Sequence, residues 1–173
     1  MNPLSVVSVV AGLVVLACSP ALDWREVRPE DSGAIALFPC KPSSHARMVV
    51  LAGSPVRLTL SACKAAGVTF GFAFADVVDP RRVGPALAEL TESAVKNVSG
   101  RTEPPRPADV SGATPNPAAA RVRVSGRRPD GDPVEEEVAV FAKGTRIYQA
   151  TVIGPKLDRE VTDMFFGGLK LDS

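Results

Sequence analysis

The sequence predicts an α+β fold, an antiparallel β-sheet with helices packed on it. The clearest signal is a hairpin over residues 134–153, in which two runs alternate at period two on either side of Gly144. Both faces of this hairpin carry apolar side chains over its middle, so both faces of the sheet need a cover. Apolar stripes at helical spacing over residues 83–98 and 157–165 provide those covers.

The length and charge of the chain limit its class. A chain of 173 residues has room for one ordinary domain with one core, and we predict that domain over residues 24–173. The formal net charge is +1, and no long block of one sign occurs, which argues against nucleic acid as a partner. Aromatic residues make up only 5% of the chain, so platforms for stacking bases are scarce.

The N-terminus carries the pattern of an export signal. Residues 4–17 form an uncharged apolar run that is too short to span a membrane and typical of a signal peptide, here predicted over residues 1–17. The run ends in Val15-Leu16-Ala17-Cys18, which resembles a bacterial lipobox. This resemblance implies a lipoprotein, lipidated at Cys18, tethered through residues 18–23, with Ser19 favouring the outer membrane. The alternative is an ordinary secretory signal that is cut nearby.

Two cysteines remain beyond the signal, Cys40 and Cys63. In the oxidising compartment that receives an exported chain, an even pair indicates a disulfide. A reactive thiol or a metal pair is the alternative, but the chain has no C-x-x-C motif and only His45 to extend a ligand set. We therefore predict a Cys40–Cys63 disulfide and neither a metal site nor another cofactor.

The first half of the domain is rich in predicted strands. They cover residues 24–27, 33–38, 46–51, 56–62 and 68–77. In the last of them Phe70, Phe72 and Phe74 recur at period two, so one face of that strand is expected to line a core. A helix follows, with Asp79 as its N-cap, and Pro85 favours a regular start near Gly84.

The second half begins with a proline-rich segment, residues 99–120. Its five prolines exclude a helix or a central strand, and we expect a loop that is either loosely ordered or binds a partner. A strand over residues 120–125 then joins the hairpin in a three-stranded meander. A helix ended by Gly167-Gly168 and a short strand over residues 169–171 complete the chain.

Side chains that could carry chemistry are few. His45 lies in a polar, turn-like stretch, and neither a G-x-S-x-G motif nor a phosphate-binding loop occurs. The acidic run of residues 135–137 starts a strand, where neighbours point to opposite faces. We expect a solvated edge there, with a cation site as the alternative.

The order of elements resembles the PsbP and Mog-type superfamily. The resemblance is carried by Phe38-Pro39, by the strand over 148–155, by Phe165-Phe166 and by the closing strand over 169–171. It implies an α/β/α sandwich around an antiparallel sheet and a binding or assembly role rather than an enzyme.

The resulting hypothesis is an exported, lipid-anchored, non-catalytic envelope protein facing the periplasm. It would contact the membrane through the lipid on Cys18 and bind or help assemble an unidentified envelope protein, through residues 99–120 or a sheet edge. A periplasmic hydrolase or thiol enzyme using His45 or the cysteines is the alternative, and a small-ligand carrier is another.

Overall fold

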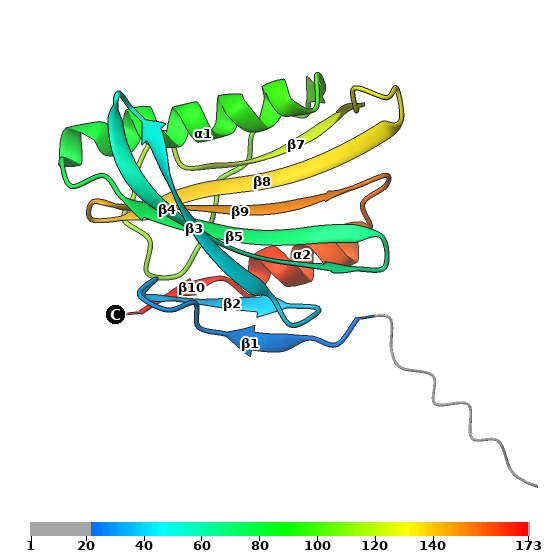
Figure 1. Cartoon of the computed structure of the whole chain (residues 1–173), viewed down its shortest axis with the longest axis horizontal. Helices are drawn as coiled ribbons and strands as arrows, with labels where there is room; N and C mark the ends of the chain where they lie inside the picture. The colour runs from blue at the N-terminus through cyan, green and yellow to red at the C-terminus, as the bar shows by residue number, and fades with distance from the viewer. Residues whose placement is uncertain (1–21, 173) are drawn as a thin grey trace, which may run out of the picture.

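The computed structural model describes residues 22–172 and is dominated by a seven-stranded antiparallel sheet (Figure 1). The strand order is β3-β4-β5-β9-β8-β7-β6, so the predicted meander lies beside the strands of the first half. The bounds are β3 Ser43–Leu51, β4 Ser54–Ala65, β5 Val68–Asp76, β6 Arg101–Thr102, β7 Ala120–Arg127, β8 Pro133–Lys143 and β9 Arg146–Gly154.

One face of this sheet packs on helix α1, Val83–Asn97. A 3-10 turn, η1 Pro80–Arg82, precedes the helix, and the Asp79 carboxylate accepts a hydrogen bond from the Arg81 N–H. Pro85 therefore falls in the first turn of the regular helix, where its missing N–H costs nothing. The buried stripe of α1 includes Leu87, Leu90 and Ala94, and the helix packs on β8 and β9.

The opposite face is covered mainly by a second, three-stranded sheet. This sheet has the order β1-β2-β10, with β1 Arg25–Val27, β2 Ala34–Phe38 and β10 Lys170–Leu171. Helix α2, Arg159–Gly167, lies beside it (Figure 1). Phe70, Phe72 and Phe74 point into this second core as expected, and the Phe165 ring meets the Phe70 ring edge-on at 5.4 Å.

The predicted fold class is therefore wrong. The chain is 48% strand and 18% helix, with two sheets and two α-helices among residues 22–172, and is a β-sandwich rather than a sheet with helices packed on it. The α/β/α layering implied by the family resemblance fails on the same ground. A row of phenylalanines shows that a face is buried, but does not show whether a helix or another sheet covers it.

The proline-rich segment 99–120 is neither helical nor loosely ordered. It adds the unpredicted edge strand β6, and Arg106 and Arg121 exchange backbone hydrogen bonds at 2.9 and 2.7 Å. Further along, the Thr114 N–H donates to the Ala142 carbonyl, and the Leu171 N–H donates to the Ser111 carbonyl. The segment is thus held against β7, the end of β8 and β10, and its apolar residues pack against both cores.

Candidate functional site

Cys40 and Cys63 form the predicted disulfide, with their Cα atoms 6.0 Å apart. Cys40 follows β2 of the small sheet, and Cys63 lies in β4 of the large one. The bond therefore joins the two layers of the sandwich, and both sulfurs are used in it. Cys18 and the predicted signal peptide lie outside the described residues. No helix within residues 22–172 has the length and apolar character needed to cross a membrane.

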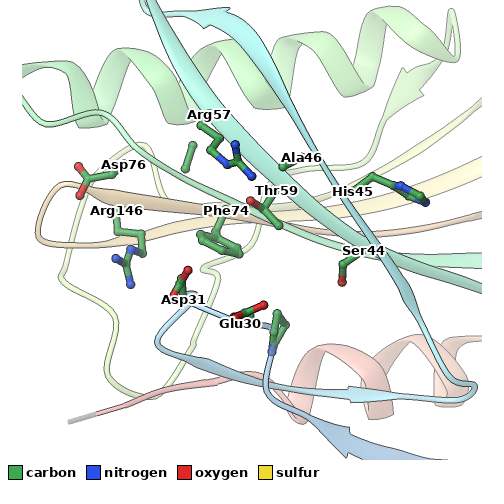
Figure 2. Close-up of a pocket in the computed structure, with 12 residues that line it drawn as sticks. Glu30, Asp31, Ser44, His45, Ala46, Arg57, Thr59, Phe74, Asp76 and Arg146 are labelled. Carbon is green, nitrogen blue, oxygen red and sulfur yellow. The ribbon is translucent and has the colours of Figure 1, made fainter.

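His45 lies on the edge strand β3, next to an open cavity of about 510 Å³ (Figure 2). The cavity is lined by side chains of both charges, among them Glu30, Asp31, Arg57 and Arg146. Figure 2 shows the His45 ring pointing away from the two carboxylates. Among the hydrogen bonds of the described residues, none joins His45 to an acid, so no oriented acid–base pair is formed there.

The wall of this cavity is positioned from the second core. Tyr148 is buried, its hydroxyl donates to the Ser32 carbonyl at 2.8 Å, and burial raises the pKa of its phenol. That bond holds the turn that carries Glu30 and Asp31 over the sheet. Within residues 22–172 no group of three or more His, Cys, Asp or Glu is placed to hold a metal ion.

The acidic run at the start of β8 is not a solvated edge, contrary to expectation. Glu137 is 1% exposed on the face of the second core. Its Oε1 accepts hydrogen bonds from Arg106 and Arg121, both at 2.7 Å, and Arg123 lies 3.6 Å from Oε2. Glu135 faces the same way. Burial opposes its ionisation, but hydrogen bonds from Arg123 and the Leu157 N–H leave its pKa lowered.

Glu137 and its arginines link four parts of the chain, which are β7, β8, α2 and the proline-rich segment. Arg121 also reaches Asp163 of α2 at 2.7 Å, and its guanidinium lies 4.2 Å from the centre of the Phe166 ring. Arg106 belongs to the proline-rich segment. The network therefore holds that segment and α2 against β7 and β8.

Glu136 points to the opposite face and has no such partners. Its side chain is 5% exposed, and no hydrogen bond or ion pair of the described residues involves its carboxylate. Burial raises the pKa of Glu136 to about 7. It lines a groove of about 260 Å³ on the α1 face of the large sheet, and we name this pocket the Glu136 groove.

Strand β3 forms one edge of the large sheet. It pairs with β4 from Ser43 to Leu51 without a bulge, and its other side has no strand partner within residues 22–172. Met48 and Val50 are 65% and 69% exposed on it. The other edge strand, β6, has only two residues. A long, regular edge with exposed apolar side chains is the kind that native proteins usually protect.

The sequence indicated a cation site at residues 135–137 only as an alternative, without singling out Glu136, and it indicated a sheet edge for partner binding without specifying β3. The signal for Glu136 was present, because a carboxylate at period two with Val134 and Val138 shares their buried face. In comparisons with models of protein families and with curated proteins, nothing matches this chain. The resemblance to the PsbP and Mog-type superfamily thus stays a prediction.

Proposed function

We propose that this protein is an exported, lipid-anchored, non-catalytic envelope protein that binds an extended segment of a protein partner along strand β3. The observation that carries the proposal is the unprotected edge of β3. Along its nine residues, every second residue directs its backbone N–H and C=O away from β4, and an added strand would pair with this row and place its own side chains beside Met48 and Val50.

The proline-rich segment, the other partner site considered, is less suitable. Ala108, Val110 and Ala113 pack against the second core, and Arg106 is engaged with Glu137. A partner would have to displace these contacts before it could use the segment, whereas β3 can add a strand without breaking anything.

Export and anchoring have separate support. The Cys40–Cys63 bond favours an oxidising compartment, because disulfides persist there. The anchor depends on Cys18 within its lipobox-like tetrapeptide. Labelling cells with a fatty acid tests this directly: the native chain should take up label and sediment with membranes, and Cys18→Ala should do neither. Equal labelling of the two would refute the anchor.

Partner binding is tested by site-specific photo-crosslinking in intact cells. A crosslinking residue at Met48 should capture one discrete envelope protein, and the same residue at Met164, which is 43% exposed on α2, should not. Val50→Lys should abolish the capture, because a charge would then lie against the added strand. Capture that is equal at both positions, or that survives Val50→Lys, would contradict the proposal. A crosslinked second copy of the chain would replace it with self-association.

A further inference from the structure

The Glu136 groove is built from five strands of the large sheet. Small side chains open it, since Gly71 and Ala73 of β5 are among its lining residues, and Leu58 and Leu60 of β4 supply apolar walls. No residue of α1 lines the groove. It is therefore a part of the sheet face that the helix leaves uncovered.

One end of the groove presents a buried carboxylate without a partner. The contrast with its neighbours is informative, because Glu135 and Glu137 are both bound by arginines, whereas Glu136 is bound by none. A buried carboxylate costs free energy unless hydrogen bonds or an opposite charge compensate for it. Its oxygens retain their full capacity to accept hydrogen bonds from a ligand.

The other charged side chain that lines the groove, Arg47, lies too far from Glu136 to compensate for its charge. Arg47 and Glu136 are the two charged side chains that line the groove. They lie on β3 and β8, four strand spacings apart, which is roughly 19 Å along the sheet. Burial alone accounts for the shifted pKa of Glu136, with no contribution from an opposite charge. On α1, the charged residues Glu89, Glu92 and Lys96 are exposed, and the Glu89 carboxylate accepts a hydrogen bond from the Ala52 N–H.

We propose that the Glu136 groove binds a small organic cation, a primary ammonium group on an apolar body, with the ammonium held by the Glu136 carboxylate. Charge complementarity selects the ammonium, because an opposite charge and a charge-assisted hydrogen bond would compensate for the largely buried carboxylate. The apolar walls select the body. The volume of about 260 Å³ limits the ligand to a short chain, on the order of six carbon atoms, beyond the charged group. This site is separate from the β3 edge and does not depend on partner binding.

The probes for this site are hexylammonium, 1-hexanol and hexanoate, titrated into the native protein above neutral pH and followed by backbone amide shifts. Hexylammonium should shift amides of β4, β5, β8 and β9 and saturate, whereas hexanoate should bind more weakly than the alcohol. Glu136→Gln should weaken hexylammonium binding about tenfold or more, or about 1.4 kcal/mol, and should leave hexanol binding unchanged. Glu92→Gln, on the exposed face of α1, is the matched control.

A second variant tests the groove without touching the charge. Gly71 has ordinary strand geometry, and a Cβ added to it would lie 3.5 Å from the Leu60 side chain, so Gly71→Val partly fills the groove. It should weaken both hexylammonium and hexanol. No saturable shifts in the native protein, equal affinity of Glu136→Gln for the ammonium, or an unaffected Gly71→Val would each overturn the proposal.

Discussion

Replacing Glu136 by glutamine should make this protein more stable above neutral pH. The Glu136 carboxyl has a pKa of about 7 when folded and 4.5 as its ordinary value. Between these values the folded state holds more protons than the unfolded state, so the free energy of unfolding falls as the pH rises. The difference between the two pKa values corresponds to about 3 kcal/mol. Glutamine keeps the shape but cannot ionise, so Glu136→Gln escapes this loss.

Urea denaturation of both proteins at about pH 4 and about pH 8 measures the effect. The native free energy of unfolding should decrease by about 3 kcal/mol more than that of Glu136→Gln over this interval. All other side chains are the same in the two proteins and drop out of the difference. Glu92→Gln should follow the native protein. Parallel pH profiles for native and Glu136→Gln would refute the conclusion that this carboxylate is buried without a partner.

Three further substitutions test other parts of the structure. Replacing both Cys40 and Cys63 by serine removes the disulfide and should lower the free energy of unfolding by about 3.4 kcal/mol, a value calculated from the 23-residue separation of the two cysteines. Urea denaturation measures this change, and a change near zero would contradict the role of the bond in joining the layers. Glu137→Gln should cost about 1–3 kcal/mol, because the buried Oε1 loses the charge on its hydrogen bonds from Arg106 and Arg121. Glu103→Gln in an exposed pair should cost about 1 kcal/mol or less, and equal thermal shifts of the two variants would count against the network. Gly126→Ala should lower stability by about 1–3 kcal/mol, since its Cβ would lie 2.0 Å from the Val98 carbonyl oxygen; an unchanged melting temperature would rule out that close approach.

Local patterns predicted most elements of this fold. The alternation around Gly144 gave the hairpin, and Asp79 with Pro85 gave the start of α1 near its observed position. What local patterns could not predict is how the layers combine. Strand β2 pairs with β10 through Ile35 and Lys170, from opposite ends of the chain, and no local signal records such a pairing. The second sheet, and with it the sandwich, was missed for that reason.

The candidate sites also divide into those that the local sequence predicts and those that depend on tertiary contacts. The disulfide was predictable, because it depends on residue type and compartment alone. The acidic run was misinterpreted, because its charges suggested solvent. The predicted meander did not give the register that sets Arg123 opposite Glu137, and it left Arg106 in a loop of undefined path. Glu136 differs from its neighbours because its carboxylate has no hydrogen-bond or ion-pair partner among the described residues, and this can be recognised only in the folded chain.

The pairing of β2 with β10 also sets an order on folding. Helix α2 and strand β10 complete the second core and come last along the chain. They nevertheless pack in the same core as Phe70, which comes early, and Phe165 of α2 contacts the Phe70 ring. β1 and β2 can cover part of this phenylalanine face early, but the part under α2 and β10 stays uncovered until the final residues are available. Exposed apolar surface of this kind makes an incomplete chain prone to aggregate, and the long-range contacts that cover it form slowly. A chain shortened before Arg159 would lack both α2 and β10, would leave Phe70 without Phe165, and should aggregate rather than fold.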